Sequence, residues 1–288
     1  MLTDLLRDHQ KAPTSNLNLS NEVTIVTAYI NIGQFQKGES QFSIFTPQLY
    51  RKWMGIFGKI TNPVVAYFND ESYYLYFKEL RSQESSQSKA VLLHRDELWS
   101  FAIRDNISDI YNQSGYPVHH PNTVIPEYPC AMHAKYELML KSIQLNPFGT
   151  KYFAWLDIGL FREINTKDQD PFQIHLPPDF NQSKVAYAEV YNFNRYSQLS
   201  DEQIFLSNSV WVCGCFFLGR IDIMETWTKE YLRHVDYFLG QRLMNTDQQV
   251  IYAVHKNHRP VTVIQTYSED SNDRRFNKWF YLGYLCKA

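Results

Sequence analysis

The chain has 288 residues, a formal net charge of −2 and a hydrophobic fraction of 44%. This length suits one large α/β domain, expected at residues 21–288 after a poorly ordered polar leader at residues 1–20. The near-neutral charge lacks the basic footprint of a nucleic-acid-binding protein. No run of about 18 apolar residues occurs, so we expect no membrane span and a cytoplasmic protein.

Strand and helix patterns alternate in the first third of the chain. A β-branched run at residues 21–30 predicts the first strand, and residues 46–60 predict a helix capped by Thr46 with Pro47 in its first turn. Apolar runs at residues 63–68 and 90–94 predict two further strands. This alternation is typical of a parallel sheet built from βαβ crossovers.

The second half continues the α/β pattern. Helical spacing at residues 131–145 and 221–239 predicts two helices. The expected strands lie at residues 152–158, 184–191 and 210–218, and Gly214 predicts a close approach of backbone or ligand in the last of them. Long loops at residues 165–183, 194–209 and 268–275 are typical of lids or binding loops.

Asp157 interrupts the most apolar strand pattern of the chain, and Gly159 follows it directly. Ligands of open α/β sheets lie beyond the carboxyl ends of the strands, so we expect Asp157 to face that crevice. A carboxylate at such a place costs several kcal/mol unless it is paired, and a divalent metal ion is one efficient partner. The structural alternative is an aspartate that caps a turn.

A second candidate carboxylate is Asp247, at the start of a helical segment. Thr246 and Gln249 have the spacing of a capping box, and Asp247 favours the positive end of the helix. The functional alternative makes Asp247 an active-site acid, and both roles are compatible.

His255 and His258 lie three residues apart, on one face if the helix continues. Core or surface histidine is the ordinary interpretation. The alternative is a metal ligand that completes a site begun by Asp157.

The four cysteines, Cys130, Cys213, Cys215 and Cys286, show no CxxC pair and no zinc-site spacing. Cys213 and Cys215 alternate on a predicted strand and face the same side. We expect all four to be reduced, packed thiols, as in most cytoplasmic proteins.

Several short motifs, in order along nearly the whole chain, resemble those of the HtrL/YibB-like family. They are TIVTAY at 24–29, Gly33, Glu127-Tyr128 with Lys135, FAWLDIG at 153–159, Gly214 with Phe216-Phe217 and Gly219, and Thr246-Asp247-Gln248. That family looks like GT-A type glycosyltransferases. The resemblance implies a GT-A-like, Rossmann-like α/β fold with a mixed, mostly parallel central sheet flanked by helices.

The activity implied by the resemblance is that of a hexosyltransferase-like enzyme of glycan biosynthesis. It would move a sugar from a nucleotide sugar, UDP-linked, to a hydroxyl of a glycan or glycosylated acceptor. The implied site comprises nucleotide contacts from Thr27, Ala28, Tyr29, Lys135 and Asp157, substrate contacts from Gly159, Gly214 and Gln248, and Asp247 as the base of an inverting reaction or the orienting acid of a retaining one.

One departure from the GT-A pattern concerns the metal. Asp157 stands at the first acid of the DxD motif, but Gly159 replaces the second acid. Mn²⁺ or Mg²⁺ would then be held by Asp157 with His255 or His258. Alternatively, Lys135 and an arginine such as Arg274 neutralise the diphosphate without a metal.

Two other functions remain open from the sequence. A nucleotidyltransferase on a similar sheet requires a further acid near Asp157 and basic residues around a triphosphate. A catalytically silent carbohydrate-binding protein requires only the fold and its aromatic residues, which make up 16% of the chain.

Overall fold

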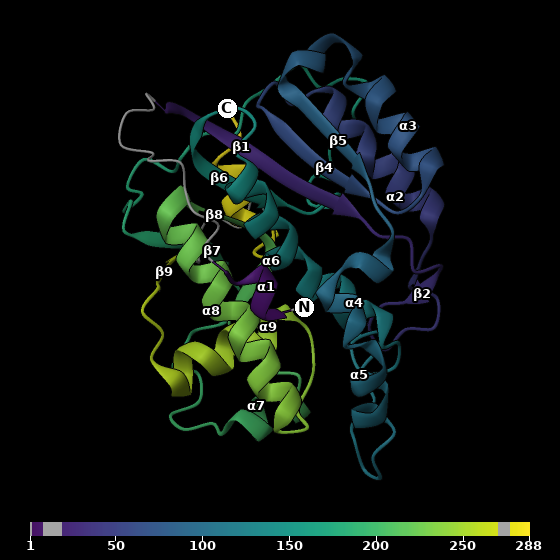
Figure 1. Cartoon of the computed structure of the whole chain (residues 1–288), viewed down its shortest axis with the longest axis vertical. Coiled ribbons are helices and arrows are strands. Elements are labelled where there is room, and N and C mark those ends of the chain that lie inside the picture. Colours follow the sequence, from purple (N-terminus) through teal and green to yellow (C-terminus); the bar gives the residue numbers. More distant parts are fainter. Residues whose placement is uncertain (1, 8–18, 270–276) are drawn as a thin grey trace.

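The computed structural model describes residues 2–7, 19–269 and 277–288. Its centre is a sheet of seven strands (Figure 1). In spatial order these are β5 (Ser88–Leu92), β4 (Val64–Phe68), β1 (Ser20–Tyr29), β6 (Thr150–Leu156), β8 (Val212–Arg220), β7 (Lys184–Glu189) and β9 (Val263–Tyr267). Strand β8 is antiparallel to β6 and β7, and the other neighbours are parallel. The prediction of a mixed, mostly parallel sheet is therefore confirmed.

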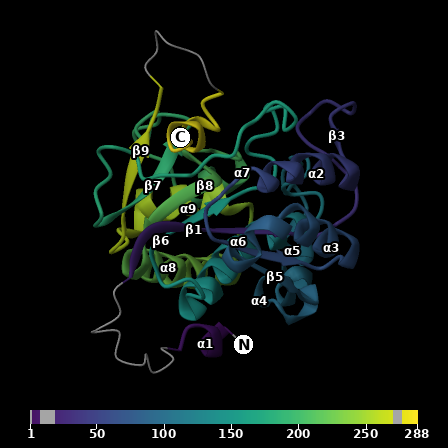
Figure 2. The same ribbon diagram turned by 90° about the horizontal axis from the view of Figure 1, so that it is seen from above.

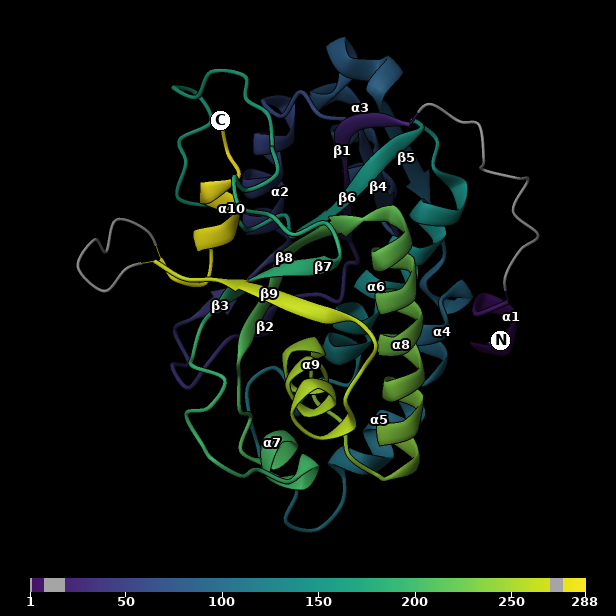
Figure 3. The same ribbon diagram turned by 90° about the vertical axis from the view of Figure 1, so that its left-hand side faces the viewer.

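Helices cover both faces of the sheet. One core contains α4 (Trp99–Ala102), α5 (Arg104–Tyr111), α6 (Glu127–Leu145), α7 (Asp201–Leu206), α8 (Ile221–Gly240) and α9 (Asp247–Ala253). The other contains α2 (Pro47–Met54), α3 (Glu71–Leu80) and α10 (Tyr281–Leu285). Figure 3 shows α6 and α8 on one side of the strands and α2 and α10 on the other. Because all the layers share one sheet, the described residues form a single α/β domain.

Neighbouring residues of β1 and β4 alternate between the two cores, as strand geometry requires. Val26 and Val65 belong to the first core, whereas Ile25 and Val64 belong to the second. Strands β1, β4 and β6 are apolar along most of their length because both of their faces are covered.

Shorter elements complete the chain. A small hairpin of β2 (Phe35–Gln36) and β3 (Ile44–Phe45) follows β1. Residues 55–58, 82–87 and 95–97 are 3₁₀ turns, and α9 continues into a π-helical turn at Val254–His258.

Local sequence signals explain where the helices beside the cavity begin and end. The Thr46 hydroxyl accepts a hydrogen bond from the Leu49 amide and Pro47 opens α2, as expected. Helix α6 ends at Asn146, which has φ 31° in the left-handed region, and Pro147 follows.

Most of the predicted leader at residues 1–20 cannot be compared, because residues 1 and 8–18 lie outside the described part of the chain. Helix α1 (Leu2–Leu5) packs Leu2, Leu5 and Leu6 against the first core. Figure 2 shows it on the same side of the molecule as α8. Among the described residues, no helix has the length and apolar character needed to cross a bilayer.

Helix α6 is fixed to α4 by a buried carboxylate. The Glu137 carboxylate accepts hydrogen bonds from the amides of Trp99 and Ser100 at 3.1 and 3.0 Å, and from the Lys141 ammonium group at 2.9 Å. The side chain of Leu98, the N-cap residue of α4, makes no hydrogen bond to these amides. Glu137 therefore supplies the cap of α4 from a neighbouring helix.

We predict that Glu137→Ala lowers the free energy of unfolding by about 2–4 kcal/mol, because two buried amides lose their acceptor. Urea unfolding checks this. The control Glu97→Ala removes an exposed carboxylate beside α4 and should change the stability by less than about 0.5 kcal/mol. Equal stability of the Glu137 variant and the wild type would show that this cap contributes nothing.

Candidate functional site

The main cavity of the protein lies where the parallel strands β1 and β6 end. It has a volume of about 570 Å³, within the usual range for small-molecule sites. Its walls come from the segment after β1, the β2–β3 hairpin, α2, α6, the turn after β6, the start of α9 and residues 277–280. The cavity therefore occupies the place where open α/β sheets bind ligands.

Three charged side chains meet in this cavity. The Lys135 ammonium group lies 3.2 Å from Asp157 Oδ1 and 3.2 Å from Asp247 Oδ2, and it donates a hydrogen bond of 3.0 Å to the Gly214 carbonyl. These residues come from α6, the end of β6, the start of α9 and β8. Three segments that are far apart in sequence thus converge on one ammonium group, which α6 carries.

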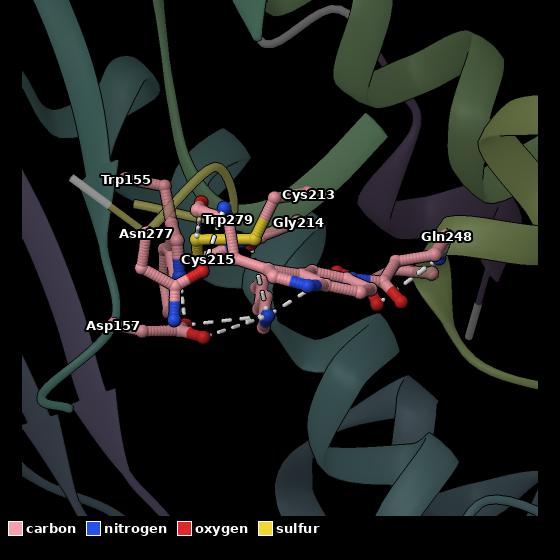
Figure 4. The surroundings of a disulfide bond; sticks show 10 residues. Trp155, Asp157, Cys213, Gly214, Cys215, Gln248, Asn277 and Trp279 are labelled. Atoms are coloured by element: carbon pink, nitrogen blue, oxygen red, sulfur yellow. Dashed lines mark hydrogen bonds and ion pairs between the residues drawn. A yellow bond between two sulfur atoms is a disulfide. The ribbon is translucent and has the colours of Figure 1, made fainter. Parts of the chain in front are cut away.

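Asp157 is the carboxylate of this cluster that is open to the cavity. Its side chain is 32% exposed, against 3% for Asp247. It accepts a hydrogen bond of 2.6 Å from the Trp155 indole, and its amide donates to the Cys215 carbonyl (Figure 4). The hydrogen bonds to its carboxylate come from Lys135 and Trp155, so it does not act as the cap of the following turn.

Asp247 is buried against the backbone of β8. A Cβ atom added to Gly214 would collide with the Asp247 carboxylate, so the position admits only glycine without a rearrangement. Strand β8 bulges here, since Ala188 and Tyr187 of β7 pair with Cys213 and Phe217. The close approach predicted at Gly214 is that of the Asp247 side chain.

The predicted capping box at α9 is wrong. The Thr246 hydroxyl donates to the Gln249 side-chain oxygen at 2.7 Å and makes no cap bond to the backbone. Asp247 Oδ1 accepts a hydrogen bond from the Gln248 amide, so the Asp247 carboxylate is the acceptor for this amide in the first turn of α9.

Burial and charge act in opposition within the cluster. Burial would lower the pKa of Lys135, but Asp157 and Asp247 outweigh burial and hold this pKa above its usual value. Burial raises the pKa of Asp247, and Lys135 opposes that rise. The arrangement therefore keeps Lys135 charged at neutral pH.

The structure also places two cations in the cavity that the sequence interpretation missed. Lys37, from the β2–β3 turn, has its ammonium group 5.2 Å from the centre of the Phe45 ring. Arg162, three residues after Gly159, lies with its guanidinium 4.5 Å from the Phe280 ring and 5.7 Å from the Trp53 ring. Arg162 is the last residue of the motif KYFAWLDIGLFR at 151–162, which begins in β6. Its place at the end of this motif is the sequence signal that would have indicated a cation in the cavity.

Some of the other residues predicted to contact a ligand line the cavity, and the rest are buried in the core. Ala28, Tyr29, Gly159 and Gln248 line the cavity. Thr27 does not line it: its side chain is fully buried and donates to the Leu156 carbonyl at 2.7 Å, so it ties β1 to β6. Gly214 is likewise covered, by Asp247.

His255 and His258 do not join Asp157. The ring of His255 lies between Trp211 and Trp227, at 5.5 and 5.0 Å, and its nitrogens lie 3.0 and 3.3 Å from the carbonyls of Ile251 and Thr262. His258 pairs with Asp201 at 2.7 Å. The π-helical turn turns both rings toward α7 and α8, away from the cavity.

A metal site made of protein ligands alone does not form in the described part of the chain, where no three His, Cys, Asp or Glu side chains are suitably grouped. Lys135 occupies the position between the two carboxylates. The open face of Asp157 offers one carboxylate, which suits only a metal ion whose other ligands are phosphate oxygens and water. Arg274, the alternative cation, lies outside the described residues.

The expectation that all four cysteines are reduced is wrong for the two that lie beside the cluster. Cys213 and Cys215 flank Gly214 and are joined by a disulfide (Figure 4), whereas Cys130 and Cys286 are free and buried. Both bonded cysteines line the cavity beside Trp279.

We predict that Gly214→Ala destabilises the fold by about 1–3 kcal/mol or more, because the new methyl group displaces Asp247 and Lys135. Thermal unfolding measures the loss. The control Gly219→Ala lies on the same strand and meets the flexible end of Met224 at 3.1 Å, so its loss should be smaller. Equal losses would contradict the tight packing of Asp247 on Gly214.

We predict that Lys135→Met costs about 3–5 kcal/mol at pH 8, because two carboxylates lose the cation between them. The pKa of Asp247 in the folded state then rises further, because Lys135 no longer opposes the effect of burial, and a carboxyl with a raised pKa destabilises the fold as the pH rises through that value. The loss should therefore be smaller at pH 5, as measured by urea unfolding at both pH values. The exposed control Lys167→Met should show no such pH dependence; an equal loss at pH 5 and pH 8 would contradict the coupling.

Comparison with known proteins gives one result for the whole chain. Residues 21–270 match the model of the HtrL_YibB family, whose description reads "bacterial protein of unknown function". No curated protein matches the chain. The match spans most of the chain, so this protein belongs to the HtrL_YibB family.

Proposed function

We propose that this protein is a glycosyltransferase that moves a sugar from a nucleotide-sugar donor, UDP-linked, to a hydroxyl of a glycan or glycosylated acceptor. The observation that supports this most is Asp157, held at the carboxyl end of β6 in a cavity of about 570 Å³ that also contains Lys37 and Arg162. The resemblance of the sequence motifs to those of GT-A enzymes adds only an analogy, since one fold hosts many activities.

The cavity offers separate surfaces for the parts of the donor. Tyr29, Tyr50 and Trp53 form an aromatic wall, with 5.4 Å between the rings of Tyr29 and Tyr50 and 5.1 Å between those of Tyr50 and Trp53. Such a wall suits a nucleobase, which stacks on aromatic rings. Lys37 and Arg162 are the partners for the diphosphate, because a guanidinium binds phosphate oxygens through two hydrogen bonds.

Charge in the cavity is consistent with an anionic donor. The cluster of Lys135, Asp157 and Asp247 has a net charge of about −1, and Lys37 and Arg162 raise the sum to about +1. Without them, the carboxylates would repel a diphosphate. A Mn²⁺ or Mg²⁺ ion bound to the diphosphate would take Asp157 as its protein ligand and would stabilise the charge on the leaving group.

In the inverting form of the reaction, an acceptor hydroxyl forms a bond to the anomeric carbon of the sugar. The bond from that carbon to the diphosphate oxygen breaks, and the nucleoside diphosphate leaves. Asp247 takes the proton of the hydroxyl, and its raised pKa suits this role. In a retaining reaction Asp247 would instead orient the acceptor.

We predict that the protein binds UDP and that Arg162→Gln weakens this binding about tenfold, because a charged hydrogen bond to the diphosphate is lost. Isothermal titration of the full chain, with and without Mn²⁺, measures both. Asp157→Asn should abolish release of UDP from UDP-sugars. The control Arg233→Gln changes an exposed arginine on α8 and should bind UDP as the wild type does.

The same experiments separate the rival functions. Absence of UDP binding with and without Mn²⁺ would overturn the proposal. Sugar binding without turnover, unchanged in Asp157→Asn, would indicate a silent carbohydrate-binding protein. Release of pyrophosphate from UTP and a sugar 1-phosphate would indicate a nucleotidyltransferase.

A further inference from the structure

A second cavity, of about 340 Å³, adjoins the first. It is lined by Tyr191, Asn192, Arg195, Tyr196, Ser207, Asn208, Ser209, Val210, Tyr252 and Trp279. Three of these, Asn208, Val210 and Trp279, also line the main cavity. The two cavities therefore adjoin along these three residues.

Arg195 is a cation without an anionic partner in this cavity. Its guanidinium lies over the rings of Tyr191 and Tyr196, at 4.8 and 5.4 Å, and it pairs with no carboxylate of the described residues. The Lys278 ammonium group also lies over the Tyr191 ring, at 3.8 Å. Arginine supported by aromatic rings is well suited to bind a carboxylate or phosphate.

The acidic side chains near the second cavity are engaged by other groups. Glu189, at the end of β7, accepts hydrogen bonds from the Phe193 amide and the Trp211 indole. Asp201 pairs with His258 and accepts a hydrogen bond from Asn257. The cavity therefore presents positive charge and aromatic rings.

Several aromatic rings line the second cavity. Tyr196 is 45% exposed at the rim, and Tyr191, Tyr252 and Trp279 lie further in. Rings that combine an apolar face with a polar edge suit the faces and hydroxyls of sugars.

Hydrogen bonds and ring contacts hold the segment that carries Arg195 and Tyr196 in place. The Lys256 ammonium group donates to the Tyr196 carbonyl at 3.1 Å. Phe193 packs its ring 4.6 Å from Trp211 and 5.8 Å from Tyr252, and the Tyr252 hydroxyl donates to the Phe193 carbonyl. This predicted binding loop is thus preformed for a ligand.

The second cavity is also connected to the start of α9. Gln249 lies two residues after Asp247, and its side chain donates a hydrogen bond of 3.3 Å to the Ser209 carbonyl. The loop that lines the second cavity is therefore bonded to α9, whose first residues, Asp247 and Gln248, line the main cavity.

We propose that the second cavity binds the acceptor of the sugar transfer and that this acceptor is an anionic glycan, with its carboxylate or phosphate on Arg195 and a sugar ring on Tyr196. This inference rests on the proposed function. It adds the location and the chemical class of the acceptor, and it places the acceptor hydroxyl at the Asp247 side of the main cavity.

Binding of three probes to the full chain tests the proposal: tri-galacturonate, maltotriose carrying a 6-phosphate, and neutral maltotriose. At least one anionic probe should bind about tenfold more tightly than maltotriose, and Arg195→Gln should remove that difference. Comparison of the two anionic probes distinguishes carboxylate from phosphate. Tyr196→Ala should weaken all three probes about equally.

Matched controls and a separate UDP titration keep the outcomes distinct. Arg233→Gln and Tyr237→Ala replace exposed residues of α8, and Tyr237 is 47% exposed, as Tyr196 nearly is. Neither control should change glycan binding, and none of the four variants should change UDP binding by more than about twofold. UDP binding without anionic glycan binding, or glycan binding unaffected by Arg195→Gln, would overturn this inference and leave the transferase proposal standing. Glycan binding that needs Arg195 in a protein that binds no UDP would overturn the transferase proposal, and the second cavity would then be a glycan site of another kind.

Discussion

The site depends on one buried ammonium group. Lys135 has three N–H donors, and the three acceptors around it are Asp157, Asp247 and the Gly214 carbonyl. Burying a charge costs several kcal/mol unless each donor finds a partner, and here the partners come from three different segments. The ends of β6 and β8 and the start of α9 are therefore fixed relative to α6 by a single side chain.

This constraint determines which groups can meet a ligand. Because Lys135 and the mostly buried Asp247 neutralise each other's charge, the exposed face of Asp157 carries the remaining negative charge of the cluster toward a ligand. Two further cations of the described residues, Lys37 and Arg162, line the same cavity and are available to an anionic ligand.

The sequence predicts those features that depend on local pattern. The strands and the long helices follow from periodicity, the Thr46 cap from its spacing, and the position of Asp157 from the apolar strand before it. Features that depend on tertiary contacts escape such analysis. Lys37 reaches the cavity from a hairpin with two-residue strands, and His255 leaves it because α9 continues as a π-helical turn that places the ring between two tryptophans. Strand β9 lies at the sheet edge and is only partly buried, so it carries a weak apolar signal.

The glycine at position 159, where the resemblance to GT-A enzymes would place a second acid, has a physical explanation in the packing of α2. A Cβ atom at this position would lie 3.2 Å from the Trp53 ring and 3.8 Å from an Arg162 guanidinium nitrogen. A carboxylate here would have to displace the ring, and it would neutralise the arginine that faces the cavity. The glycine therefore keeps both the aromatic wall and the positive charge available to a ligand. Under the proposed function, in which side-chain cations hold a diphosphate, an acid at this position would compete with Trp53 and Arg162 for the same space.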